Sequence, residues 1–149
     1  MSDINVDTVA RTICGEARNQ GQSGMEDVAS IIVNRADIAA SYVAAHGKNH
    51  PLFGDGTDAS ACKANWHGVY QFSCWTPGDP NLPIIQNLNP NMAIFRDALN
   101  IADEACSGGL DDRTQGATHY KVIGTFAEWA VGKTPCYVNG AHEFYNNID

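Results

Sequence analysis

Positive charge is scarce in this sequence. Of its 149 residues, 9 are Lys or Arg and 17 are Asp or Glu, so the formal net charge is -8 at pH 7. Proteins that bind nucleic acid or anionic lipid carry clustered basic side chains, and no such cluster is seen here. We therefore expect no nucleic acid and no membrane as a partner, and we expect a monomer.

The pattern of a secretory signal is also missing. Residues 1–7 are polar and acidic, without a basic start followed by an apolar run. No stretch reads as the roughly 20 apolar residues that cross a bilayer. We therefore expect the chain to be made in the cytoplasm.

Cysteine and histidine spacings typical of metal sites are absent. The five cysteines contain no CxxC pair, and the five histidines contain no HExxH motif. We expect no metal and no other cofactor, although ligands far apart in sequence stay open. An odd number of cysteines leaves at least one thiol unpaired. We expect buried free thiols, with Cys62 and Cys74 as the first pair to test.

What is present is the composition of one globular domain, with 44% hydrophobic and 17% charged residues. Residues 7–17 have helical spacing, with Asp7 as the expected N-cap. A second helix is expected to begin at a Ser23–Glu26 capping box and to pack along the first. Its apolar stripe has the i, i+3, i+4, i+7 spacing and comprises Met25, Val28, Ala29, Ile32, Ala36 and Ala39.

The rest of the chain predicts an irregular region, a third helix and a few strands. Residues 46–90 are rich in Gly, Pro, Asn and aromatics, which predicts a long irregular stretch with one hairpin near residues 69–72. Asn89-Pro90 predicts the start of a third helix, which Gly108-Gly109 ends. Residues 117–123 predict a strand, and Asn139-Gly140 predicts a tight hairpin between residues 135–138 and 141–145. Together these elements predict a single α+β domain over residues 1–149.

Glu16 is the first candidate for chemistry. It lies near the C-terminal end of the first predicted helix, beside Gly15, which we expect to leave space next to it. A carboxyl group in a partly desolvated cleft near the negative end of a helix holds its proton near neutrality, which suits protonation of a glycosidic oxygen. Alternatively, Arg18 holds Glu16 ionised in a salt bridge.

Several short motifs then follow in one order along the chain. They are Thr12–Arg18 (TICGEAR), Val28–Arg35 (VASIIVNR), Gln71–Ser73 (QFS), Ala117–Tyr120 (ATHY), Trp129 and His142–Phe144 (HEF). In this order they resemble the SleB/CwlJ-type cell wall hydrolases, which include spore cortex-lytic enzymes and phage lysins. Two features depart from the family pattern: Cys14, where members often have Tyr, and residues 74–77 (CWTP), an insertion after the hairpin.

The resemblance implies a lysozyme-like α+β fold and cleavage of peptidoglycan glycan strands, with Glu16 as the catalytic residue. Similar enzymes act mainly as lytic transglycosylases. The acid protonates the leaving oxygen and then, as a base, helps the 6-hydroxyl of muramic acid close onto C1. We expect the chain to be a phage or prophage endolysin that reaches the wall after host lysis or from a virion.

Substrate-binding residues are expected around Glu16. Gln71 and Ser73 are candidates for hydrogen bonds to the sugar, Trp75 for stacking against a sugar ring, and His119 and Tyr120 for the cleft. Each also has a structural alternative: hydrogen bonding within the hairpin for Gln71 and Ser73, and packing for the others. Trp66 and Trp129 are expected in the core or in the cleft wall.

Other reactions stay open. A hydrolytic muramidase needs a second carboxylate, for which Asp55, Asp58 and Asp79 are candidates. A zinc amidase, a non-catalytic peptidoglycan-binding module, and a cysteine peptidase that uses Cys74 and His119 are further alternatives. The proline and glycine after Cys74 disfavour the last, because such a nucleophile normally begins a helix.

Overall fold

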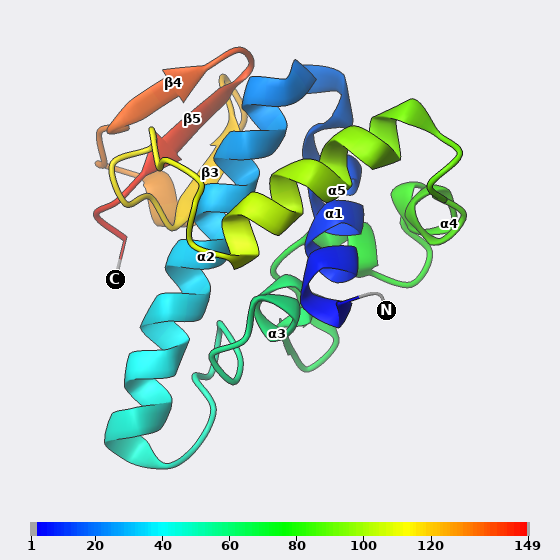
Figure 1. The fold of residues 1–149 in the computed structure, drawn as a ribbon. Coiled ribbons are helices and arrows are strands. Elements are labelled where there is room, and N and C mark those ends of the chain that lie inside the picture. The colour runs from blue at the N-terminus through cyan, green and yellow to red at the C-terminus, as the bar shows by residue number, and fades with distance from the viewer. Residues whose placement is uncertain (1–2, 149) are drawn as a thin grey trace.

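The computed structural model describes residues 3–148 and shows a helical core with a small sheet on one side (Figure 1). The helices are α1 (Ile4–Ala17), α2 (Gly21–His46), α3 (Asp58–Lys63), α4 (Asn81–Gln86) and α5 (Ala93–Cys106), with short 3-10 turns η1 (Arg18–Gln20), η2 (Ser73–Trp75) and η3 (Glu128–Ala130). The strands are β1 (Asn65–Trp66), β2 (Val69–Tyr70), β3 (His119–Val122), β4 (Tyr137–Asn139) and β5 (His142–Tyr145). The predicted α+β class is confirmed.

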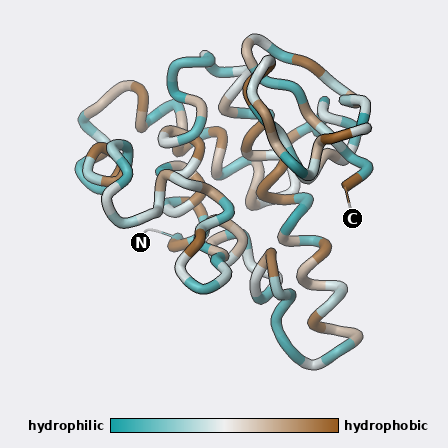
Figure 2. Tube along the Cα trace, turned by 180° about the vertical axis from the view of Figure 1, so that it is seen from behind, coloured by the Kyte–Doolittle hydropathy of each residue, from teal (hydrophilic) through white to brown (hydrophobic). Residues whose placement is uncertain are grey.

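The core forms where α1, α2 and α5 pack against one another. α5 crosses both other helices (Figure 1), and hydrophobic and hydrophilic residues alternate along α2 (Figure 2). Every residue of the predicted α2 stripe is at most 2% exposed. Because burial of a large apolar side chain contributes about 1.5–3 kcal/mol, this stripe holds α2 in the core. The prediction that α2 packs along α1 is confirmed.

The predicted starts of the first two helices are wrong. The N-cap of α1 is Asp3, whose carboxylate accepts from the Asn5 amide at 2.8 Å, whereas Asp7 pairs with Arg11. The sequence does not predict this first turn, because Ile4 lies outside the helical spacing of Val9, Ile13 and Ala17. In the structure its side chain is exposed. α2 begins at Gly21 directly after η1, so Ser23 lies inside the helix and forms no capping box.

The stretch between α2 and α5 is more regular than predicted. It contains α3, the β1–β2 hairpin and α4, and the hairpin lies at residues 65–70. α5 begins at Ala93, because Asn89 accepts from the Asn91 amide and forms a turn before the helix. Helices of six residues, such as α3 and α4, have fewer than two turns and give little periodic signal.

The second sheet has the strand order β3-β5-β4 and is antiparallel throughout. The predicted strand at residues 117–123 and the hairpin that follows are both confirmed. The predicted turn is one residue off: Asn139 is the last residue of β4 and pairs with His142, so Gly140 and Ala141 form the turn. Gly140 has φ 58°, as the tight turn requires. This sheet places Tyr120, from the middle of β3, opposite Phe144 of β5.

By length and composition alone, the helical run Ile4–His46 could cross a membrane, contrary to the expectation from sequence. Its apolar side chains, however, form much of the core: Val9, Ile13, Val28 and Ile32 have no exposed surface. This is the pattern of a core helix.

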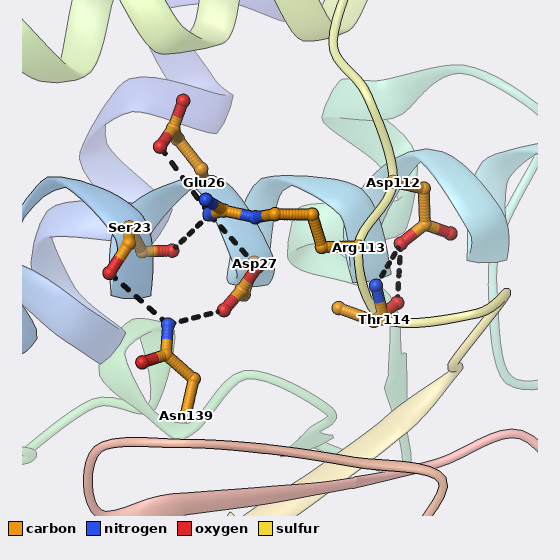
Figure 3. A network of polar contacts seen from close by, with 7 residues as sticks. All are labelled: Ser23, Glu26, Asp27, Asp112, Arg113, Thr114 and Asn139. Atoms are coloured by element: carbon orange, nitrogen blue, oxygen red, sulfur yellow. Dashed lines mark hydrogen bonds and ion pairs between the residues drawn. The ribbon is translucent and has the colours of Figure 1, made fainter.

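A polar network ties α2 to the sheet (Figure 3). Asp27 is 1% exposed, and its carboxylate accepts from Asn139 at 2.7 Å and from Arg113 at 3.3 Å. Asn139 also donates to Ser23, at 3.2 Å. Because the partners come from β4 and the loop before β3, the network sets the position of the sheet against α2.

We predict that Asp27→Asn lowers the free energy of unfolding by about 1.5–3 kcal/mol, since hydrogen bonds to a buried charge contribute that much. Urea unfolding measures the change. The matched control is Glu26→Gln, which removes a more exposed contact with the same arginine and should cost less than about 1 kcal/mol. Equal losses in the two variants would show that the burial of Asp27 does not strengthen the contribution of its hydrogen bonds to the free energy of unfolding.

Candidate active site

Glu16 lies in the last turn of α1, where three segments of the chain meet. Its Oε1 accepts from the Tyr120 hydroxyl of β3 at 2.5 Å. Its Oε2 accepts a longer bond, 3.4 Å, from the Cys74 amide of η2. The carboxylate is half-buried and held from two sides, so its orientation is set by the fold.

Two hollows border this carboxylate. The first, which we name the Glu16 hollow, has a volume of about 190 Å³ and is lined by Glu16, Arg35, Gln71, Ser73, His119, Tyr120 and Trp129. The second, which we name the Asn81 hollow, has a volume of about 240 Å³ and is lined by Gly15, Glu16, Arg18, Asn19 and Asn81. Because Glu16 lines both, an extended ligand that occupies the two hollows would pass over its carboxylate.

Among residues 3–148, Glu16 is the only acidic residue that lines either hollow. The three other candidates for a second carboxylate lie elsewhere. Asp55 accepts from the Thr57 amide, and Asp79 accepts from the Asn81 amide at the start of α4. Asp58 lies in the first turn of α3. None of the three lines a hollow with Glu16.

The proposed salt bridge between Arg18 and Glu16 is wrong. Arg18 donates to the Cys14 carbonyl at 3.0 Å and to the Asn81 side chain at 2.9 Å. In the described part of the chain it forms no ion pair with Glu16. Its guanidinium is held by α1 and α4, which leaves the Glu16 carboxylate to Tyr120 and η2.

Gly15 lets η2 approach α1. As expected, Gly15 borders open space beside Glu16, the Asn81 hollow, but the position that a Cβ would take is filled. A Cβ at residue 15 would lie 2.7 Å from the Cys74 Cβ, 2.8 Å from the Cys74 Sγ and 3.1 Å from the Ile85 Cγ2. Glycine is therefore needed here for close approach, and this approach brings the Cys74 amide to Glu16.

We predict that Gly15→Ala destabilises the protein by about 1–3 kcal/mol through overpacking, despite the better helix propensity of alanine. Urea unfolding measures the loss. Gly109→Ala is the control, because the nearest atom to its added Cβ is 3.7 Å away. If Gly15→Ala is as stable as the control variant, the packing of η2 against α1 is looser than described.

Tyr120 and His119 present neutral groups to the Glu16 hollow. Burial and the neighbouring Glu16 raise the pKa of Tyr120 well above its ordinary value, so the phenol stays protonated and donates. Burial and the charge of Arg35 lower the pKa of His119 to about 4. His119 packs on Trp129 at 4.9 Å between ring centroids. At neutral pH its imidazole is uncharged.

Arg35 is a site residue that the sequence reasoning missed. It is 4% exposed, its Nε donates to the Thr118 carbonyl at 2.7 Å, and its guanidinium lies over the rings of Phe53 and Phe72. Its Nη1 is buried and has no partner among the described residues. Burial lowers its pKa to about 10, so it remains positively charged at neutral pH. The sequence does contain a signal for it: an arginine beside Ile31, Ile32 and Ala36, within an apolar helix, indicates a buried charge.

The structure brings most, but not all, of the predicted site residues together. Gln71, Ser73, His119 and Tyr120 line the Glu16 hollow, and so does Trp129. Trp75 does not: its indole donates to Thr12 at 2.9 Å, and the Lys63 ammonium lies 4.5 Å from its ring centroid. The Trp75 ring therefore packs against Thr12 of α1 and Lys63 of α3, and it is not placed to stack on a ligand in the Glu16 hollow.

The cysteines are all free, so the expectation of free thiols is confirmed and Cys62 and Cys74 form no disulfide. Cys74 has no exposed surface, and burial together with Glu16 raises the pKa of its thiol. A buried protonated thiol is a poor nucleophile, which argues against the cysteine peptidase alternative. Across residues 3–148, no three His, Cys, Asp or Glu side chains group closely enough to hold a metal ion.

Comparison with known proteins adds one finding. A sequence model of the family described as Cell Wall Hydrolase matches residues 19–145, which is most of the chain. No curated protein and no solved structure matched. The matched range contains every residue of the Glu16 hollow except Glu16 itself. A catalytic role for Glu16 is therefore argued from its geometry and not from this match.

Proposed function

The chain belongs to the SleB/CwlJ-type cell wall hydrolase family, whose members degrade peptidoglycan, and from this premise we propose the bond and the reaction. The proposed bond is the β-1,4 link between N-acetylmuramic acid and N-acetylglucosamine. The proposed reaction is that of a lytic transglycosylase, with Glu16 as acid and then base.

One observation carries this proposal: in the described structure Glu16 is the single acidic residue on both hollows. Hydrolytic glycosidases use two carboxylates that flank the bond. A transglycosylase needs one, because the same group gives and then takes a proton. The isolation of Glu16 therefore favours the transglycosylase over the hydrolytic muramidase.

The proposed reaction has two steps. The protonated Glu16 gives its proton to the glycosidic oxygen, and the bond between that oxygen and C1 of muramic acid breaks. The Glu16 carboxylate then takes the proton of the 6-hydroxyl as O6 bonds to C1, which forms a 1,6-anhydro ring. No water is consumed, and Glu16 regains its proton.

The neighbours of Glu16 suit these steps. Tyr120 holds Oε1, so Oε2, with only a long bond from the Cys74 amide, is the oxygen best placed to carry the proton. Arg35 supplies a fixed positive charge that stabilises the carboxylate formed after the first step. Gln71 and Ser73 line the same hollow and can hydrogen-bond to the acetamido and hydroxyl groups of the sugars.

Mass spectrometry of purified peptidoglycan digested by the chain tests the reaction. Muropeptides that end in 1,6-anhydro-muramic acid are the expected products. Reducing muramic ends would instead indicate a hydrolytic muramidase, free stem peptides an amidase, and binding without products a non-catalytic module. The role of a phage or prophage endolysin stays a prediction.

A further inference from the structure

A third hollow lies beside the Glu16 hollow and has no part in the reaction above. It has a volume of about 420 Å³ and forms between the loop after α2, the end of α3 and strand β1. Its lining includes His50, Lys63, Ala64 and Trp66. We name it the Trp66 hollow.

One side of this hollow is an exposed aromatic ring. Trp66 of β1 is 57% exposed, and the ring contact found for it is with its neighbour His67. A large aromatic face left in water on a short hairpin has little structural use. Such faces bind rings that have one apolar side and a polar edge, as pyranose sugars have.

The rest of the hollow supplies hydrogen-bond donors. The His50 Nδ1 accepts from the amides of Leu52 and Phe53, both at 3.1 Å, which places the ring proton on Nε2. Lys63 also lines the hollow, and its ammonium, which lies 4.5 Å from the Trp75 ring centroid, forms no ion pair within residues 3–148. A hollow with these donors suits a ligand rich in acceptors, such as an acetamido carbonyl or a carboxylate.

This hollow has no lining residue in common with the Glu16 hollow, but contacts between residues connect the two. His50 stacks on Phe53 with ring centroids 4.8 Å apart, and Phe53 meets His119 of the Glu16 hollow at 6.3 Å. On the other wall, the Ala64 carbonyl accepts from the Gln71 amide at 3.0 Å. The two hollows are therefore neighbours in the fold, near enough for different sugars of one strand to occupy them.

Another hollow of the molecule suits this polymer less well. It lies between α1 and α5, has a volume of about 320 Å³, and carries three carboxylates, those of Asp3, Asp7 and Asp103, against one guanidinium, that of Arg11, which pairs with Asp7. Muramic acid and the stem peptides of peptidoglycan are acidic. Like charges repel, so that hollow disfavours the polymer, whereas the Trp66 hollow is lined by a lysine and no carboxylate.

We propose that the Trp66 hollow is a binding subsite for an N-acetylated sugar of the same glycan strand, remote from the bond that is cleaved. The sugar ring stacks on Trp66, and its acetamido or lactyl oxygens accept from His50 and Lys63. This subsite rests on the proposed function, since it holds another part of the same substrate. Its task is to bind the polymer, so its loss weakens binding with little change in the rate of the chemical step.

The test is Trp66→Ala, with binding and chemistry measured separately. In a Glu16→Gln background, cosedimentation with purified peptidoglycan should show an apparent Kd about tenfold higher, or about 1.4 kcal/mol. In the active chain, kcat should stay within about twofold of wild type. Val69→Ala is the control, because Val69 pairs with Trp66 across the hairpin, is 69% exposed and does not line the hollow.

The outcomes separate the two proposals. A wild-type chain that releases no glycan fragments overturns the proposed function and the subsite with it. If the wild type is active and Trp66→Ala binds as tightly as Val69→Ala, the subsite alone is overturned. A chitin oligosaccharide should compete for the Trp66-dependent part of binding. Competition by isolated stem peptide in its place would assign the hollow to peptide and overturn the proposal.

Discussion

Glu16→Gln is expected to reduce the cleavage of peptidoglycan by about 10³-fold or more, because in the proposed reaction Glu16 both gives and takes the proton. The fold should survive the change. The glutamine carbonyl can still accept from the Tyr120 hydroxyl, and the side chain keeps its shape. The clearing rate of purified cell walls measures the loss of activity, and thermal unfolding measures the stability.

Two further measurements make this result specific. Cosedimentation with peptidoglycan should show binding close to that of the wild type, since a neutral amide still fits between the two hollows. Glu26→Gln makes the same chemical change away from both hollows and should clear walls at the wild-type rate. If Glu16→Gln keeps a tenth of the activity or more, another group supplies the proton.

Arg35→Met is expected to lower kcat by about 10²-fold, the size of effect found when one fixed electrostatic group is removed from an active site. Methionine fills much of the same volume between Phe53 and Phe72 and leaves no unpaired donor, but the Thr118 carbonyl loses its hydrogen bond from Nε. That loss should lower the free energy of unfolding by about 1–3 kcal/mol. Urea unfolding measures this cost, and kcat is compared under conditions in which both proteins are folded.

The Arg35→Lys variant separates an electrostatic role of Arg35 from a structural one. Lysine keeps a positive charge at this position but cannot reproduce the flat guanidinium over the rings of Phe53 and Phe72. If the charge is what matters, Arg35→Lys should recover much of the kcat that Arg35→Met loses. A kcat of Arg35→Lys as low as that of Arg35→Met would assign Arg35 to packing alone.

Periodic patterns predicted the long helices and the second sheet well. The α2 stripe from Met25 to Ala39 is buried as expected. Apolar residues repeated at helical spacing form one continuous face, and a helix has few alternative ways to bury such a face. The hairpin around Gly140 was predictable for a different reason: its two-residue turn needs a positive φ, which glycine adopts readily.

What the sequence could not predict depends on contacts between distant segments. The filled space at Gly15 exists only because η2 and α4 fold against α1, some sixty to seventy residues away in the chain. The sequence predicts Trp75 as a stacking residue, whereas the fold places Thr12 and Lys63 against it. Arg35 belongs to a sequence motif, but its unpaired Nη1 follows only from the position of its guanidinium among the aromatic rings.

The proposed mechanism depends on the position of Glu16 between two hollows, with no second carboxylate on either among residues 3–148. Digestion of peptidoglycan in water labelled with heavy oxygen, followed by mass spectrometry of the new glycan ends, shows whether a single carboxylate is enough. Anhydro ends that carry no heavy oxygen are expected from the wild type and not from Glu16→Gln. Heavy oxygen at C1 of the new muramic ends would contradict the proposed mechanism, because a water molecule would then have attacked with the help of a second group.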